Sequence, residues 1–171
     1  MEYKMDLFNE HLIKVRKSFG QSLSQALIIV TAVFSSVLFT VPYFGTIIPP
    51  LFWFGAYYVM RYFSVEYEYS FTNGGLDIDK IYAQKKRVHV LSVNVKQFEI
   101  LAPVTTETFA ARMQDKNIKN RVDASSHANT AGTYFSVFNL EDKGRTILFF
   151  EPPEKMINAI KSYIPRRVVD E

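Results

Sequence analysis

Residues 20–60 contain no Asp, Glu, Lys or Arg, although 22% of the residues in the chain are charged. This uncharged, largely apolar stretch constrains the fold more than any other feature. A helix that spans a bilayer needs about 20 apolar residues, so the stretch has room for two. A buried hairpin in a soluble protein is the alternative. It is disfavoured because a chain of 171 residues has too little other surface to wrap two fully apolar helices.

The stretch divides into two predicted spans within a membrane segment at residues 20–63. The first span covers residues 23–41, and Pro42-Tyr43-Phe44-Gly45 then supplies residues typical of a turn. The second covers residues 46–63 and has two prolines near its start, where a missing N–H group costs least. We therefore expect a transmembrane helical hairpin. Ala32 and Ser36 form a pair of small residues four apart, a spacing that lets membrane helices pack closely.

Basic residues predict the orientation of this hairpin. Three of them lie shortly before the first span and one closes the second, while the connecting turn has none: Lys14, Arg16, Lys17 and Arg61. Cytoplasmic loops carry the excess of Lys and Arg in membrane proteins. The sequence therefore indicates a two-span protein of the cell membrane with both termini in the cytoplasm.

Residues 1–19 are predicted to form an amphipathic helix that begins near Asp6. Its apolar stripe follows helical spacing and consists of Phe8, Leu12, Val15 and Phe19. Such a stripe fits two placements equally well. The helix can lie in the headgroup plane beside the membrane segment, or it can pack against the protein's own soluble domain.

The pattern after residue 63 changes from continuous to alternating. In 64–71, apolar and polar residues alternate with period two, which is typical of a half-buried strand, and Thr72-Asn73-Gly74-Gly75 is typical of a hairpin turn. Further strands are predicted at 76–83, 88–93, 98–101, 121–124, 133–140 and 145–151. An amphipathic helix follows Pro152-Pro153 and ends at Pro165. We expect a soluble domain at 64–165 and a tail at 166–171.

Seven short strands followed by one helix predict an α+β or all-β domain of the pleckstrin-homology-like (PH-like) type, a seven-stranded barrel capped by its C-terminal helix. The segment VEYEYSFTNGGLDIDKIYAQKKRVHVLSVNVKQFEILAP at 65–103 carries a resemblance. It resembles an uncharacterised bacterial family of two-helix membrane proteins with a C-terminal PH-like domain, over about residues 5–151. The resemblance implies a fold and a location, and no activity.

Lys85, Lys86 and Arg87 form the densest basic cluster, at a predicted hairpin tip. They are candidates for contact with anionic lipid headgroups or a partner, and the alternative is a solvated turn. Eukaryotic PH domains that bind phosphoinositides place Lys and Arg in the first hairpin loop. Here that loop is 72–75 and has no basic residue, so we expect no phosphoinositide recognition.

Other residue patterns point away from catalysis, metals and nucleic acid. Cysteine is absent, and the histidines show no spacing of metal ligands. Asp77 and Asp79 supply too few oxygens for a calcium or magnesium site. No GxSxG motif, phosphate loop or dinucleotide fingerprint occurs, and the net charge of +3 is too small to indicate a nucleic-acid binder. We therefore predict no enzyme activity and no cofactor.

Three functional hypotheses remain from the sequence. The first is a membrane-anchored, non-catalytic interaction or scaffold module that binds a protein partner or itself next to the bilayer. The second is sensing of anionic lipid headgroups at the cytoplasmic face. The third is an accessory subunit of a membrane transport or envelope-stress complex, assembled through its helices.

Overall fold

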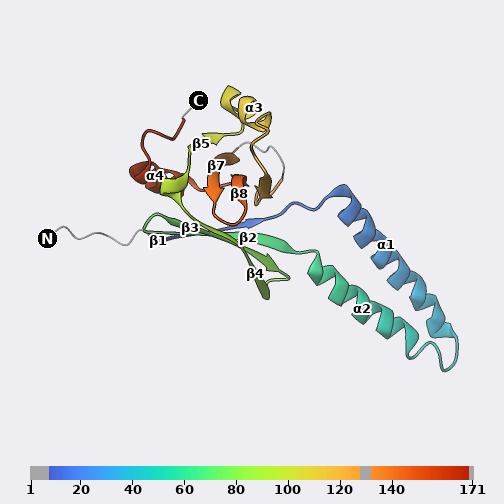
Figure 1. Ribbon diagram of the computed structural model, residues 1–171. Coiled ribbons are helices and arrows are strands. Elements are labelled where there is room, and N and C mark those ends of the chain that lie inside the picture. The colour runs from blue at the N-terminus through green and yellow to red at the C-terminus, as the bar shows by residue number, and fades with distance from the viewer. Residues whose placement is uncertain (1–7, 128–131, 170–171) are drawn as a thin grey trace. The chain divides into compact units, whose positions relative to one another are not determined.

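The computed structural model describes residues 8–127 and 132–169. The chain divides into two compact units, which are described separately (Figure 1). The helical unit comprises Arg16–Val65 and Tyr82–Lys86. The sheet unit comprises the described parts of Met1–Val15, Glu66–Ile81 and Arg87–Glu171.

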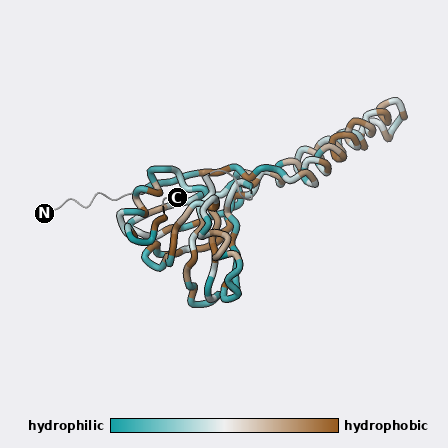
Figure 2. Tube along the Cα trace, turned by 90° about the horizontal axis from the view of Figure 1, so that it is seen from above, coloured by the Kyte–Doolittle hydropathy of each residue, from teal (hydrophilic) through white to brown (hydrophobic). Residues whose placement is uncertain are grey.

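Two helices form the helical unit. Helix α1 (Phe19–Ser35) continues into the 3₁₀ helix η1 (Ser36–Thr40), and α2 (Ile48–Tyr62) packs against α1. Figure 2 shows hydrophobic residues along both helices. The turn between them needs a glycine at position 45, because a Cβ there would lie 2.3 Å from the carbonyl oxygen of Leu38. The two helices and their turn form a helical hairpin, and its crossing of a membrane stays a prediction.

One helix, Phe19–Thr40, has the 22 residues and the apolar composition needed to cross a membrane. Helix α2 has 15 residues, which correspond to about 22 Å at 1.5 Å per residue, against a hydrocarbon core of about 30 Å. The predicted second span at 46–63 is therefore only partly helical. Of the two predicted spans, only the first forms a helix that is long enough by itself to cross a membrane.

The sheet unit contains two four-stranded sheets. The first has the order β1-β2-β3-β4 and is formed by β1 (Phe8–Lys14), β2 (Val65–Thr72), β3 (Gly75–Tyr82) and β4 (Lys86–Asn94). The second has the order β5-β7-β8-β6 and is formed by β5 (Ile100–Pro103), β7 (Tyr134–Leu140), β8 (Gly144–Phe150) and β6 (Asn120–Asp123). Between them along the chain lie η2 (Val95–Gln97) and α3 (Glu107–Met113), and α4 (Glu154–Tyr163) follows the last strand.

The β2–β3 hairpin turns where the sequence predicts. Asn73 and Gly74 both have positive φ, 50° and 89°, which these two residue types adopt at low cost. In strand β2, Tyr67, Tyr69 and Phe71 enter the main core of the unit, and Glu66 and Glu68 on the other face are also buried. Helix α4 contributes Met156, Ala159 and Ile160 to this core.

Two tyrosines of β2 connect the first sheet to the second. The Tyr69 hydroxyl donates to the carbonyl of Ala124 (2.6 Å) and accepts from the N–H of Glu151 (3.2 Å). The Tyr67 hydroxyl donates to the carbonyl of Asp123 (3.0 Å). Burial raises the pKa of Tyr69, so its hydroxyl remains a hydrogen-bond donor at neutral pH.

The N-terminal segment corrects one prediction. We expected a helix through residue 19, but Phe8–Lys14 is a strand that pairs antiparallel with β2, from Phe8 opposite Thr72 to Lys14 opposite Glu66. An isolated short helix is marginal in water, whereas this segment gains a full ladder of hydrogen bonds. Its sequence also alternates: His11 and Ile13 are half-buried, and Leu12 is exposed.

The predicted seven-stranded barrel also needs correction. All seven predicted strands form, and β1 adds an eighth among the described residues. The two sheets are not closed into a barrel, because no ladder joins an edge of one sheet to an edge of the other in the described part of the chain. Strands β1, β4, β5 and β6 remain at sheet edges.

Candidate functional site

The pair of small residues predicted for helix packing lies within the helical unit. Ala32 is 1% exposed, and the indole N–H of Trp53 in α2 donates to the Ser36 hydroxyl (3.2 Å). Further along α1, Gln25 is buried and accepts a hydrogen bond from the Lys17 ammonium (2.9 Å). A role for this packing in assembly with another protein stays a prediction.

Basic residues collect at one end of the helical unit. They are Arg16, Lys17, Arg61, Lys85 and Lys86, and the unit has no Asp or Glu. The first two precede α1, Arg61 lies in the last turn of α2, Lys85 lies in the β3–β4 turn, and Lys86 is the first residue of β4. The N–H of Ala83 in that turn donates to the carbonyl of Ser64, directly after α2 (2.8 Å). The helical unit therefore has a positively charged end and an uncharged turn at 41–47.

The predicted basic cluster divides into two parts. Arg87 is engaged by two carboxylates, with a short contact to Glu68 and a distance of 3.7 Å between Nη1 and Oδ2 of Asp79. Lys85 and Lys86 are exposed, and neither forms an ion pair with another described residue. The two lysines are thus unpaired among the described residues, whereas Arg87 is paired although its side chain is 59% exposed; contact of the three with a headgroup or partner stays a prediction.

Polar side chains continue from Arg87 across the β3–β4 hairpin. The Nδ1 atom of His89 lies 2.9 Å from Oδ1 of Asp79, and its Nε2 atom lies 3.2 Å from the hydroxyl of Ser92. This order of groups matches a Ser–His–Asp relay, in which the hydroxyl must donate to the histidine. Here the hydroxyl of Ser92 donates to Asp77 instead. The cluster therefore acts as a set of cross-strand hydrogen bonds.

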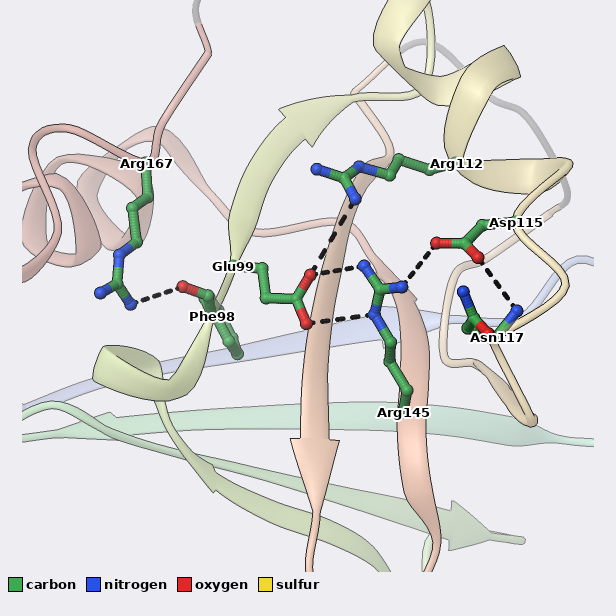
Figure 3. A network of polar contacts seen from close by, with 7 residues as sticks. All are labelled: Phe98, Glu99, Arg112, Asp115, Asn117, Arg145 and Arg167. Carbon is green, nitrogen blue, oxygen red and sulfur yellow. Dashed lines mark hydrogen bonds and ion pairs between the residues drawn. The ribbon is translucent and has the colours of Figure 1, made fainter.

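A second polar network joins β8 to the segments beside it (Figure 3). Arg145 donates to both carboxylate oxygens of Glu99, through Nε (3.1 Å) and Nη2 (2.6 Å), and to Asp115 through Nη1 (2.5 Å). The N–H of Asn117 and the Arg145 guanidinium lower the pKa of Asp115, and Glu99 raises the pKa of Arg145. The Nη1 atom of Arg112 also lies 4.0 Å from Oε2 of Glu99, so two arginines face two carboxylates and the network holds these segments together.

Two of the hollows, of similar volume, lie in different units. One, of about 380 Å³, lies along the edge strand β4 and the β7–β8 turn; it is lined by His89, Val90, Leu91, Ser92, Gln97 and residues 139–143. The other, of about 460 Å³, lies between α1 and α2 and is lined by Leu27, Ile28, Thr31, Leu51, Phe52, Gly55, Ala56 and Val59. Within the residues that the structure describes, no three His, Asp or Glu side chains gather as metal ligands.

A family model described as a bacterial PH-like domain (DUF6106) matches residues 5–170. The chain belongs to this family. No curated protein and no solved structure matches the chain. The sheet unit is hereafter called the PH-like unit. PH-like domains are generally non-catalytic.

Sequence reasoning missed one contact of the PH-like unit. Residues 166–169, expected as a tail, lie along the edge strand β5, where Leu101 and Val168 form a parallel bridge. The N–H of Leu101 donates to the carbonyl of Arg167 (2.8 Å), and the N–H of Val169 donates to the carbonyl of Leu101 (2.9 Å). The pair of valines after two arginines was the available signal, since β-branched residues favour strands.

Proposed function

We propose that this protein is a membrane-anchored, non-catalytic binding module. In this proposal the helical unit crosses the bilayer twice and holds the PH-like unit at the cytoplasmic face, where it binds a protein partner. The observation that carries the proposal is the exposure of large apolar side chains on α1, η1 and α2. Examples are Phe34 (72%), Phe39 (58%), Leu51 (65%) and Phe54 (64%).

Exposed apolar side chains of this size are unfavourable in water. Burying one large apolar side chain contributes about 1.5–3 kcal/mol, and the helical unit exposes many of them. The hydrocarbon core of a bilayer covers such side chains on all sides of a helical hairpin. Lipid contact therefore explains an apolar surface that the helical unit does not bury by itself.

The charges of the helical unit support the proposed orientation. All five basic residues lie at the end where α1 begins and α2 ends, and the turn at 41–47 is uncharged. By the positive-inside rule, that charged end is cytoplasmic. The chain of the PH-like unit leads into the start of α1 and leaves from the end of α2, which both lie at the charged end. Both termini therefore lie on the cytoplasmic side in this proposal.

The length of α2 sets a condition on the second crossing. Its roughly 22 Å fall short of a hydrocarbon core of about 30 Å. Residues 46–47 and Phe63 beside the helix must therefore also lie in the membrane, or the bilayer must thin locally, at a cost of fractions of a kcal/mol per Å. This cost is small beside the apolar area that the two helices present.

Extraction of cell membranes with alkaline carbonate tests the anchor, and affinity capture in mild detergent tests the binding role. We expect the chain to stay in the membrane pellet and to capture a partner. Val33→Arg places a charge on an exposed position of α1 and should weaken insertion by about 2.5–3.5 kcal/mol. Thr105→Arg, at an exposed position of the PH-like unit, is the matched control and should stay in the pellet.

Two results would count against this proposal. Release of the unmodified chain by carbonate would show that something other than lipid covers the apolar surface. Stable insertion with no captured partner and no self-association would leave the anchor standing and remove the binding role.

Contact with anionic lipid is a second candidate function, favoured by one observation. Lys85 and Lys86 are exposed in the same compact unit as α1 and α2, at a turn hydrogen-bonded to Ser64 directly after α2. Basic residues near an anionic surface contribute about 1 kcal/mol each. In nanodiscs, anionic lipid should therefore slow amide exchange in this turn.

The double variant Lys85→Ala with Lys86→Ala should lose that protection. The control is Lys116→Ala with Lys155→Ala, which removes the same charge from exposed positions of the PH-like unit. Equal exchange in neutral and anionic nanodiscs would refute lipid contact at this turn.

A further inference from the structure

The segment 166–169 lies along β5 in the manner of an added strand. Its backbone exchanges two hydrogen bonds with Leu101, through the carbonyl of Arg167 (2.8 Å) and the N–H of Val169 (2.9 Å). Leu101 lies opposite Ser136 of β7, so the segment continues the second sheet beyond β5. Addition of a strand to an open edge is one of the recurring ways in which domains bind peptides.

The edge of β5 offers one backbone N–H group and one carbonyl to an extended segment. Leu101 is 0% exposed, and its single N–H group donates to Arg167 of the segment. When residues 166–169 leave, either water or the carbonyl of another extended segment can accept from this N–H group. The edge therefore suits a backbone in the extended conformation.

Side chains of the segment add specificity. The guanidinium of Arg167 donates through Nη1 to the carbonyls of Lys96 (2.7 Å) and Phe98 (2.8 Å), and Figure 3 shows the second bond. Val168 packs against the main core, and Val169 packs against the second apolar cluster of the unit. The edge thus binds an arginine followed by two β-branched apolar residues.

Few contacts hold the segment in place. Both valines remain partly exposed and Arg167 is exposed, so the segment covers the edge without being enclosed. Five hydrogen bonds, one of them from the N–H of Arg167 to the carbonyl of Ile164 (3.0 Å), and two partly buried side chains compete with the entropy of ordering the segment. A partner that presents the same groups can therefore replace it.

We propose that the β5 edge of the PH-like unit is a peptide-binding site that residues 166–169 occupy in the free protein. Its ligand is an extended segment of a partner protein, with an arginine followed by two β-branched apolar residues. Binding of this ligand displaces residues 166–169. This inference specifies the partner class of the proposed binding module, and it does not depend on the membrane anchor.

The test uses a chain that ends at Pro165 and a fluorescent peptide with the sequence of residues 163–171, in mild detergent. We expect saturable binding to the shortened chain and binding at least roughly tenfold weaker to the full chain, whose own segment competes. Arg167→Ala in the peptide should weaken binding roughly tenfold, because charge-assisted hydrogen bonds to two carbonyls are lost. Arg166→Ala is the matched control, since the Arg166 side chain is exposed and forms no hydrogen bond with another described residue.

No binding to a shortened chain that still unfolds cooperatively would overturn the proposal, and so would equal binding of the two variant peptides. Should the shortened chain fail to fold, the comparison moves to full chains. Arg167→Ala in the full chain weakens its own segment, so the unmodified peptide should bind that chain roughly tenfold more tightly than the Arg166→Ala chain. Equal binding to these two chains would overturn the proposal.

Self-association gives the remaining outcome. A dimer that Arg167→Ala abolishes and Arg166→Ala preserves would overturn the assignment to a separate partner, because the segment would then be exchanged between copies. Carbonate extraction distinguishes this inference from the anchor. Release of the chain from membranes would refute anchoring and leave peptide binding in detergent unaffected.

Discussion

Replacement of Tyr69 by phenylalanine removes one oxygen that joins the two sheets of the PH-like unit. The hydroxyl donates to the carbonyl of Ala124 at 2.6 Å and accepts from the N–H of Glu151 at 3.2 Å. Tyr69 and Ala124 are both 0% exposed, so water does not readily replace the lost partner. The phenylalanine ring keeps the edge-on contact with Phe150, whose ring centroid lies 5.9 Å away.

The expected cost follows from these contacts. A buried carbonyl that loses its donor costs about 1–3 kcal/mol, and the ring packing is unchanged. Urea unfolding of the full chain in mild detergent, followed by near-ultraviolet circular dichroism, measures this loss. Tyr163→Phe is the matched control: its ring also packs edge-on, against Phe71, and its hydroxyl forms no hydrogen bond with another described residue.

The loss should also depend on pH in one direction. Burial raises the pKa of Tyr69 above its ordinary value of 10.0, so the stability that the protonated hydroxyl contributes is fully present below pH 10.0. It declines as the pH rises further, because the unfolded state then gains by losing the proton. The difference between the unmodified chain and Tyr69→Phe should therefore shrink above pH 10.0. If Tyr69→Phe lowers the free energy of unfolding by less than about 0.5 kcal/mol at neutral pH, the role of this oxygen is refuted. The same holds if Tyr69→Phe and Tyr163→Phe lower it equally.

Three further outcomes are expected. The pKa of Asp115 is lowered from 3.8, so its carboxylate stabilises the fold above pH 3.8. This contribution declines as the pH falls through the pKa of the folded state. The difference in melting temperature between the unmodified chain and Asp115→Asn should therefore shrink over that range. Arg87→Ala leaves the buried Glu68 without its arginine and should cost about 1 kcal/mol in urea unfolding, whereas Lys86→Ala should change little. Ala32→Leu overfills a site that is 1% exposed. It should lower the free energy of unfolding in sodium dodecyl sulfate by about 1–3 kcal/mol, measured by fluorescence of the single tryptophan.

Local patterns in the sequence predicted much of the fold. The β2–β3 turn was predictable because Asn73 and Gly74 accept positive φ, and α4 because an apolar helical face follows two prolines. The segment Phe8–Lys14 was not, since its residues fit both periods and only the pairing with β2 decides between them. Closure of the barrel was wrong for a related reason: which sheet edges pair depends on contacts between distant residues.

Candidate sites were less predictable than strands. Lys85, Lys86 and Arg87 are adjacent in sequence, but only the structure shows that Arg87 is engaged by Glu68 and Asp79. The contact of residues 166–169 with β5 joins segments that are far apart along the chain. The two valines favour an extended segment, but no local spacing shows which strand such a segment would pair with.

The crossing of the bilayer by both helices is tested most directly by the accessibility of single cysteines. The chain has no cysteine, so Tyr43→Cys in the exposed turn and Ser162→Cys in α4 each introduce one thiol. In intact cells, a membrane-impermeant maleimide should label position 43 from outside and label position 162 only after permeabilisation. Labelling of both positions only after permeabilisation, or of both in intact cells, would contradict a hairpin that crosses twice and leaves the PH-like unit in the cytoplasm.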